Sequence, residues 1–430
     1  MATLGDTVTT GSAALKEYYV DDVCKPLYFK ENPAFAMVRK DTAWGGKSYL
    51  RIPFIWGVSG GISTDFSAAQ ATAAATFERV SEVQIARAKT HSIGYIDNEL
   101  IRATKNDAKA FIRAVKTKTD ALVTNLGRDL EIAFFRDGYG YRGRLSSTQT
   151  LSSSTITLAQ ASDAYNFEVG QRYDVTAAVG STAAAKAYGS SGNPLIVTAT
   201  DTDAGTVTFG YAINDATNGI PTIAVSDYLM LKGDVGTSAA NGYRPKPCGL
   251  LGWCPDAAPS SGESFYGLDR SVSNRLYGQR LDLTTGANIN LSLIEGINKG
   301  VGKAASYGGR LNRGFCSWTT YEDVINSMEA KVFVEREVMA GIGFRGVKIV
   351  TPKGDVELYP SIGCDDAHLW LVDMSNIALY TLDDAVQISD EDGFEMVRAY
   401  NADASEIRYK SMGNYGCSAP GASIVNIKVR

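Results

Sequence analysis

A long amphipathic stretch, residues 107–137, is the feature that most constrains how this chain folds. Its apolar residues follow the i, i+3, i+4, i+7 spacing of one helix face. They are Ala108, Phe111, Ile112, Val115, Leu122, Val123, Leu126, Leu130 and Ala133. Asn106 suits the N-cap, Asp107 the first turn and Gly138 the position after the last turn. The stretch predicts a helical rod roughly 45 Å long. Gly127 lies inside this helix and either kinks it or allows another segment to pack closely against it.

The composition excludes several classes of protein. The chain has 430 residues, 44% hydrophobic and 21% charged, so it can bury a sizeable core, divided between two or three folding units. Only 2 residues are histidine, which excludes a His-rich metal site and leaves any His-dependent triad to His91 or His368. The net charge of −5 offers no basic surplus to neutralise phosphates, which disfavours a dedicated nucleic-acid binder.

Location and redox state also follow from the sequence. No run of about 18 apolar residues occurs, so no segment is expected to span a membrane. The N-terminus, Met1 to Asp6, lacks the basic and apolar regions of a secretory signal, which predicts a protein made and kept in a cytosol. No two cysteines form a CxxC pair, so all are predicted to be free thiols, mostly buried. They are Cys24, Cys248, Cys254, Cys316, Cys364 and Cys417.

Two segments without a core of their own precede the predicted helix. Residues 1–43 read as an arm that lies on something else, with a short helix from Leu15 to Val23 and extended pieces after Pro26 and around Asn32-Pro33. Residues 44–96 read as a long two-stranded hairpin with a loose stretch from 57 to 76. Two strands alone are marginally stable in water, so this hairpin needs a surface to lie on, which another subunit could supply.

The aromatic residues of this hairpin have two interpretations. Trp44, Phe54 and Trp56 are either ordinary core residues or part of a contact between subunits, where tryptophan is enriched. Arg79 and Arg87 lie on the returning strand. The five residues are therefore candidates for a subunit interface.

Residues 145–240 differ from their flanks and read as an inserted β-rich domain. Serine, threonine, alanine and glycine dominate, and short strands recur between turn signals, as in a small barrel or sandwich. The predicted strands are Thr155–Leu158, Arg172–Thr176, Leu195–Thr200, Thr206–Tyr211 and Tyr228–Leu231.

The last part of the chain mixes helices and strands, which predicts the α+β class. Asn290–Tyr307 is a helix candidate, and a second helix is expected from Tyr321 to Phe333, with Thr319 and Glu322 forming a capping box. The predicted strands are Phe315–Trp318, Val347–Val350, Val356–Tyr359, Ala367–Val372, Ile377–Tyr380, Phe394–Tyr400, Glu406–Tyr409 and Ile424–Val429.

Two glycine motifs resemble nucleotide-binding loops but lack the required context. Gly46-Lys47-Ser48 resembles the end of a phosphate-binding loop, but Asp41 stands where that loop needs glycine and a strand follows instead of a helix. Residues 341–346 fit GxGxxG, but the helix precedes it and the strand follows, the reverse of a dinucleotide site. We expect neither to bind a nucleotide.

A third cluster, Cys364-Asp365-Asp366-Ala367-His368, gathers groups that can bind metals or act as acids. No second cluster with ligand spacing accompanies it, apart from acidic loops such as Asp390-Glu391-Asp392. An exposed turn before a strand is the favoured interpretation. A hydrolase that pairs Asp365 or Asp366 with another carboxylate is the enzymatic alternative.

The order of these segments resembles one family, the major capsid proteins of tailed bacteriophages with the Hong Kong-type (HK-like) fold. Short stretches add to the resemblance: Gly249-Leu250-Leu251-Gly252, the junction Trp318 to Val324, the strand pair Leu371 to Tyr380 and the closing strand Ala422–Val429. The resemblance implies an N-terminal arm at 1–43, an extended loop at 44–96 and a peripheral domain with the spine helix at 97–144. It places an inserted β-barrel domain at 145–240, and an axial domain with the remaining peripheral strands at 241–430.

The resemblance implies a structural protein, not an enzyme, with no catalytic residue, cofactor or metal. Its copies would assemble as pentamers and hexamers into an icosahedral shell around double-stranded DNA, without sequence-specific DNA binding and without a membrane. The expected partners are scaffolding, portal and decoration proteins, and the expected location is the virion, after assembly in the host cytoplasm. A cellular nanocompartment shell with the same fold is the alternative. The inserted domain could also recognise host glycans.

Overall fold

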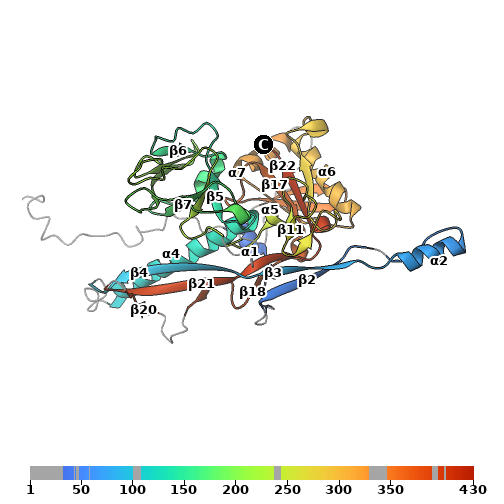
Figure 1. The fold of residues 1–430 in the computed structure, drawn as a ribbon, viewed down its shortest axis with the longest axis horizontal. Coiled ribbons are helices and arrows are strands. Elements are labelled where there is room, and N and C mark those ends of the chain that lie inside the picture. Colours follow the sequence, from blue (N-terminus) through green and yellow to red (C-terminus); the bar gives the residue numbers. More distant parts are fainter. Residues whose placement is uncertain are drawn as a thin grey trace, which may run out of the picture. The chain divides into compact units, whose positions relative to one another are not determined.

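The computed structural model describes residues 32–42, 44, 48–57, 59–99, 108–236, 244–328, 346–389, 396–400 and 403–430, apart from the side chains of 108–117. All of them belong to one compact unit, Glu31–Arg430, which is mixed α+β (Figure 1). Most of the predicted arm, including its helix at Leu15–Val23, lies outside the described residues. Asn32-Pro33 does not give an extended piece, because Pro33 begins the short helix α1 (Pro33–Met37). Proline is well suited to this first helical position, where its missing N–H has no partner to lose.

The predicted long helix is confirmed as α4 (Ala108–Phe135). Its buried residues include Leu126, Leu130 and Phe134. Gly138 follows with φ +85°, a conformation that glycine adopts without strain. At Gly127 a Cβ atom would lie 3.4 Å from the Asn32 side chain, an ordinary van der Waals distance, so the segment before α1 packs beside this position without requiring glycine there.

The predicted hairpin exists but is shorter than expected and contains a helix. β2 (Tyr49–Ile55) pairs antiparallel with β3 (Val80–Ala86), and α2 (Phe66–Ala75) lies between them. Because α2 is alanine-rich and buries no residue, it lacks the apolar periodicity that predicts a helix. Ala88–Asp97 forms a separate strand, β4, which pairs with β21 (Ala404–Cys417) instead of with the hairpin.

One face of the hairpin packs on the chain's own core. Ile52, Phe54, Val83 and Ile85 are all buried in a cluster that includes residues from α4 and from the last third of the chain. The hairpin therefore does not depend wholly on another subunit for a surface. Pro53 lies in β2, which has no partner on its outer side within the described part of the chain, as expected of proline in a strand.

A six-stranded sheet lies against α4. In it β21 pairs with β4, β18 (Ile377–Thr381), β19 (Gln387–Ile388) and β20 (Met396–Arg398), and β1 (Arg39–Asp41) adds to β18. β4 and β21 run side by side along α4 (Figure 1). A Cβ at Gly94 would lie 2.8 Å from a terminal carbon of Leu122, so α4 packs closely on β4 at this position and a larger residue would displace the Leu122 side chain.

A second six-stranded sheet is built from the last part of the chain. Its order is β13 (Gln279–Asp282), β22 (Ile424–Lys428), β17 (His368–Val372), β14 (Arg313–Cys316), β16 (Gly354–Pro360) and β15 (Val347–Thr351). Helices α6 (Leu293–Ser306) and α7 (Trp318–Met328) share a hydrophobic core with it. The smaller elements nearby are α5 (Leu250–Trp253), β11 (Ser264–Phe265), β12 (Leu268–Asp269) and α8 (Pro420–Ser423).

The starts of the two helices show where local signals succeed and fail. α6 begins with a capping box formed by Ser292 and Glu295, three residues later than its predicted start at Asn290. The predicted box at Thr319 and Glu322 is wrong. Ser317 caps α7 instead, because its Oγ accepts a hydrogen bond from the N–H of Thr320 at 3.2 Å.

The β-rich domain is a six-stranded sheet with its own core. The order is β5 (Tyr141–Arg144), β10 (Tyr228–Leu231), β7 (Arg172–Thr176), β8 (Leu195–Asp201), β9 (Thr206–Phe209) and β6 (Thr155–Thr157). All five predicted strands are present, and β5 adds a sixth that precedes the predicted boundary at residue 145. An antiparallel bridge between Leu145 and Leu158 joins the two end strands.

Candidate functional site: a buried charge cluster and an exposed hairpin end

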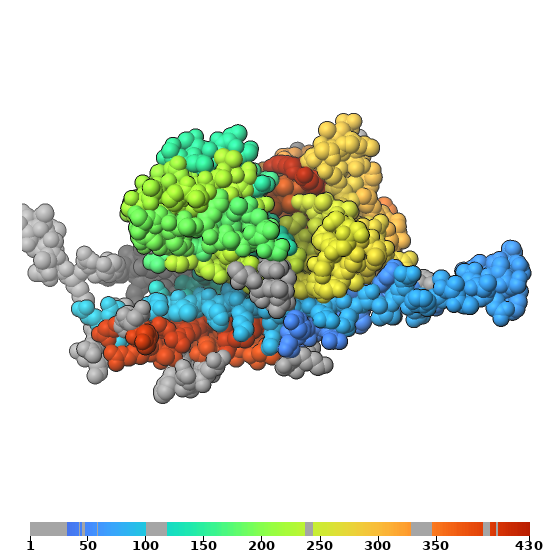
Figure 2. Space-filling model, viewed as in Figure 1, coloured from blue at the N-terminus to red at the C-terminus, as the bar shows by residue number. Residues whose placement is uncertain are grey.

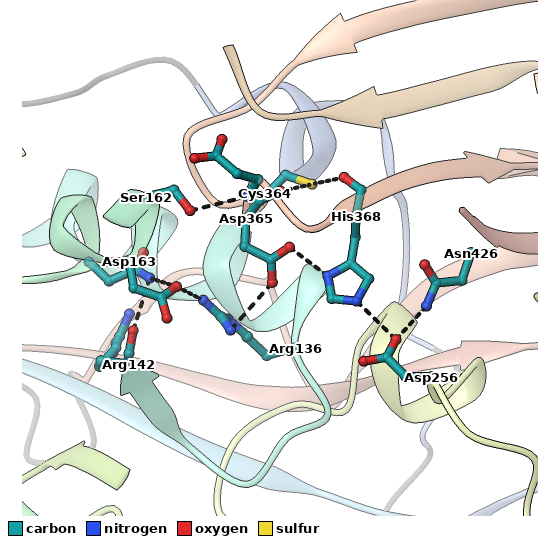
Figure 3. Close-up of polar contacts among 11 residues, drawn as sticks. Arg136, Arg142, Ser162, Asp163, Asp256, Cys364, Asp365, His368 and Asn426 are labelled. Carbon is teal, nitrogen blue, oxygen red and sulfur yellow. Dashed lines mark hydrogen bonds and ion pairs between the residues drawn. The ribbon is translucent and has the colours of Figure 1, made fainter. Parts of the chain in front are cut away.

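A chain of polar side chains, all largely buried except the half-exposed Asp256, joins the β-rich domain to the second sheet (Figure 3). Arg136 directly follows α4, and Asp163 lies in the 3₁₀ helix η1 (Ala161–Asn166). Asp365 and His368 stand at the start of β17, Asp256 follows α5, and Asn426 lies in β22. Five segments that are far apart in the sequence therefore meet through these six residues.

Arg136 is the link between the two domains. Its guanidinium forms an ion pair with Asp163 and a second one with Asp365, whose Oδ2 is 3.6 Å away. The three side chains are 4% to 10% exposed. The guanidinium also lies 5.1 Å from the centre of the Tyr141 ring, at the start of β5. Burial raises the pKa of Asp163 to about 6, although Arg136 acts in the opposite direction.

His368 lies between two carboxylates. Its Nδ1 is 2.5 Å from Asp365 Oδ1, and its Nε2 is 2.9 Å from Asp256 Oδ1. Asn426 Nδ2 donates to the same Asp256 oxygen at 2.8 Å. Burial alone would lower the pKa of His368, but Asp365 and Asp256 outweigh it and raise the pKa to about 10. At neutral pH the ring is therefore an imidazolium that donates from both nitrogens.

The cluster is suited to holding segments together and not to acid–base catalysis. Although burial acts to raise the pKa of Asp365, His368 and Arg136 lower it below its usual value, so this carboxyl is no proton donor at neutral pH. In the described ranges no group of three or more histidine, cysteine, aspartate or glutamate side chains could hold a metal ion. The predicted exposed turn at Cys364–His368 is wrong, because segments from elsewhere in the chain bury it.

The ionisation of His368 predicts a pH dependence that a variant isolates. Since the folded-state pKa lies above the ordinary 6.5, the stabilisation from His368 is fully present below pH 6.5 and is lost as pH rises toward 10. We expect H368Q to lower the free energy of unfolding by a few kcal/mol at pH 6, and by progressively less toward pH 10. Urea denaturation of both chains from pH 6 to 10 measures this difference. A difference that does not change with pH would contradict the assignment.

A cavity of about 260 Å³ adjoins the cluster. Its lining comes from η1, from the turn between β8 and β9, from the start of α7 and from the loop before β17, and it includes Asp203, Asp366 and Trp318. The backbone N–H of Asp366 donates to Ser162 Oγ at 3.1 Å, which fixes the loop against η1. The cavity therefore lies between the β-rich domain and the second sheet.

The far end of the hairpin carries a group of exposed apolar side chains. Large apolar side chains there are between 59% and 99% exposed: Ile55, Ile62, Phe66, Phe77 and Val80. In Figure 2 α2 ends the blue segment, and no other coloured segment covers it in that view. The sequence analysis did not identify these residues as interface candidates. A signal was available for two of them: in the alternation of each strand, Ile55 lies on the opposite face from Phe54, and Val80 on the opposite face from Val83.

Comparison with known proteins agrees with this architecture. No protein-family profile and no curated protein matches the sequence. A chain of the cyanophage A-1(L) capsid is 12% identical, with a TM-score of 0.51, over 98% of this chain and 99% of its own. A chain of Mycobacterium phage Bobi (10% identity, 98% of each chain, TM-score 0.47) and one of the capsid of a native GTA particle (8%, 99% of each, 0.48) also match. This chain has the fold of a phage capsid subunit. The resemblance seen in the order of its segments is confirmed at the level of the fold.

Within this capsid fold, the five predicted interface residues divide into two groups. Trp44 and Phe54 are 1% and 6% exposed and pack in the chain's own core, as the core interpretation expected. Trp56 is partly buried, its Nε1 donates to Ser81 Oγ at 3.0 Å, and the exposed Arg79 lies 5.4 Å from its ring. Arg87 lies 5.8 Å from the Trp44 ring. A contact with a second subunit stays a prediction for all five, and Trp56 and Arg79 have the free surface for it.

Three further predictions can be placed in the capsid fold. The five cysteines in the described residues are free and buried. Most of the two glycine motifs, Gly46-Lys47 and residues 341–345, lies outside the described residues. As expected, a strand follows each motif: β2 follows the first and β15 follows the second. Within the described residues, no helix has the length and apolar character to cross a membrane.

Proposed function

We propose that this chain is a major capsid protein, a structural subunit that self-assembles into an icosahedral shell around a double-stranded DNA genome. The observation that carries the proposal is the fold shared with the cyanophage A-1(L) capsid chain over nearly the full length of both chains. The finer assignment is the HK-type fold. In it α4 is the spine helix of the peripheral domain, the β2–β3 hairpin is the extended loop, and the second sheet belongs to the axial domain.

The hairpin supports self-assembly on physical grounds. A closed shell requires each subunit to bury surface against several neighbours. Exposed apolar patches of this kind mark interaction sites in soluble proteins. The end of the hairpin, from Ile55 to Val80, offers such a patch, which the described residues leave uncovered. Arg79 and Trp56 adjoin it, so the proposed interface extends from the predicted residues to the newly found ones.

The β-rich domain is proposed to be an inserted, closed barrel with a stabilising role. Beside the bridge between Leu145 and Leu158, the N–H of Ser146 donates to the Thr157 carbonyl at 3.0 Å, and the N–H of Ala159 donates to the Arg144 carbonyl at 2.8 Å. These bonds link the first and last strands of the sheet, as closure of a barrel requires. A role in recognising host glycans is the alternative for this domain.

The remaining assignments follow from the proposal. Copies of the chain would form pentamers and hexamers, with scaffolding, portal and decoration proteins as partners, and the shell would assemble in the host cytoplasm and become part of the virion. The mild net charge of −5 suits a shell that encloses DNA without binding it sequence-specifically. We propose no cofactor, no metal and no enzymatic activity.

Two alternatives are separated by simple observations. A nanocompartment shell would co-purify with cargo enzymes instead of genomic DNA. A carbohydrate-active hydrolase would need Asp365 or Asp366 as a catalytic acid, but Asp365 is committed to Arg136 and His368. A D365N/D366N variant that loses a measurable glycosidase activity would support the hydrolase and contradict the capsid proposal.

Sedimentation velocity of the purified full chain tests the proposal. We expect assemblies far larger than the 46.0 kDa monomer, either spontaneously or when a scaffolding protein is supplied. A chain that stays strictly monomeric under all such conditions would overturn the proposal.

A further inference from the structure

Glu131 is an acidic residue near the C-terminal end of α4 that is 2% exposed. Its carboxylate accepts three hydrogen bonds from two other segments. The backbone N–H of Ala34 donates to Oε1 at 3.2 Å, the N–H of Phe35 donates to Oε2 at 2.6 Å, and Ser361 Oγ donates to Oε1 at 2.7 Å. Glu131 therefore joins α4 to the first turn of α1 and to the loop before β17.

The surroundings of Glu131 are tightly packed. A Cβ at Gly363 would lie 3.2 Å from Glu131 Cγ, so the loop before β17 covers the side chain closely. The charged group that acts on the carboxylate is Lys40 of β1, whose Nζ also donates to the Phe35 carbonyl at 2.5 Å. From β21 comes Tyr415, whose hydroxyl donates to the Leu130 carbonyl at 2.9 Å. Burial raises the pKa of Glu131 to about 7, although Ser361, Phe35, Ala34 and Lys40 act to lower it.

The position of α1 depends on this contact. A helix of five residues is too short to be stable by itself. The two N–H groups that Glu131 accepts from belong to its first turn, where a helix has no internal partners for them. If α1 lifts away, water reaches the carboxyl and its pKa falls toward the usual value for glutamate. Lifting α1 therefore releases a proton in the pH range between the two values, and a rise in pH favours it.

We propose that Glu131 is a proton-controlled latch for the segment that leads into β1: the protonated carboxyl closes α1 onto α4, and ionisation loosens it. The neutral carboxyl keeps one carbonyl oxygen that accepts from one of the two α1 N–H groups, and it avoids the penalty of a buried charge. The latch belongs to the single chain and does not depend on shell assembly.

Hydrogen exchange of the full chain between pH 5 and pH 8.5, corrected for intrinsic exchange rates, tests the latch. We expect the protection of the Ala34 and Phe35 amides to fall as pH rises through about 7, by up to about 100-fold. E131Q should remove this pH dependence. S361A removes a hydrogen bond that favours the ionised form, so it should move the loss of protection to higher pH.

The matched control is E295Q, which alters the capping glutamate of α6, where Glu295 Oε2 accepts from the N–H of Ser292 at 2.9 Å. This variant should keep the wild-type pH dependence at Ala34 and Phe35. Equal protection at pH 5 and pH 8.5 in the wild-type chain overturns the proposal, whether or not the variants fold. An E131Q chain that retains the wild-type pH dependence also overturns it.

Discussion

Replacing Arg136 with methionine is expected to lower the free energy of unfolding by about 3–5 kcal/mol. The change removes the cation that Asp163 and Asp365 share and leaves two carboxylates in a site where the side chains are at most 10% exposed. Methionine keeps much of the side-chain volume, so the effect reports the charge more than the packing. Urea denaturation of the full chain at pH 7 measures it.

The control for this prediction is R430M. Arg430 also forms an ion pair with an aspartate, Asp323, but the two side chains are 43% and 44% exposed. Exposed pairs contribute about 1 kcal/mol or less, because water screens them. If R136M proves no more destabilising than R430M, the buried cluster does not hold the β-rich domain to the second sheet.

Deleting the end of the hairpin is expected to abolish shell formation while leaving the subunit folded. The variant joins Trp56 to Arg79 through a two-residue Asn-Gly turn, which suits the twist of paired strands. Trp56 and Arg79 are already partners, since the Trp56 N–H donates to the Arg79 carbonyl at 3.0 Å. The deleted segment includes α2, which buries no residue, so the melting temperature should change by only a few degrees.

A second variant tests whether shell formation needs the length of the hairpin or the apolar side chains at its end. It replaces residues 57–78 with a glycine–serine linker of the same length, which keeps the reach of the hairpin but removes Ile62, Phe66 and Phe77. Electron microscopy of both variants is the measurement, with circular dichroism as the check of folding. Closed shells formed by the deletion variant would show that the hairpin end is not a required contact between subunits.

The strongest local signals in the sequence predicted the structure well. The amphipathic stretch 107–137 became α4 (Ala108–Phe135), because a long helix with one buried face repeats its pattern many times. The strands Arg172–Thr176 and Tyr228–Leu231 have their predicted bounds, since turn signals flank both. The order of segments was also sufficient to predict a capsid fold.

Features that depend on distant partners were not predictable. Residues 77–96 read as one returning strand, but β3 pairs with β2, and β4 pairs with β21, more than three hundred residues away. The alternating pattern continues through both strands and does not show where the partner changes. Similarly, Asp365 and His368 suggested an exposed turn because Arg136, Asp163 and Asp256, which bury and neutralise them, have no characteristic spacing.

The candidate interface shows the same limit. Tryptophan and phenylalanine on a hairpin can pack in the chain's own core or form a contact between subunits. Only the folded structure shows that Trp44 and Phe54 are buried in the core, whereas the residues nearer the hairpin end are exposed. Phe66 and Ile62 lie in a stretch whose small residues predicted a loose loop. Their exposure became visible once α2 was placed at the end of the hairpin.

Cryo-electron microscopy of the purified particles tests the proposed function most directly. The expected result is a closed icosahedral shell in which pentamers and hexamers of this chain can be traced, with the hairpin end of each subunit, around Phe66, lying against a neighbouring copy. A sample that contains only monomers or irregular aggregates, in the presence of a scaffolding protein as well as in its absence, would contradict the capsid assignment.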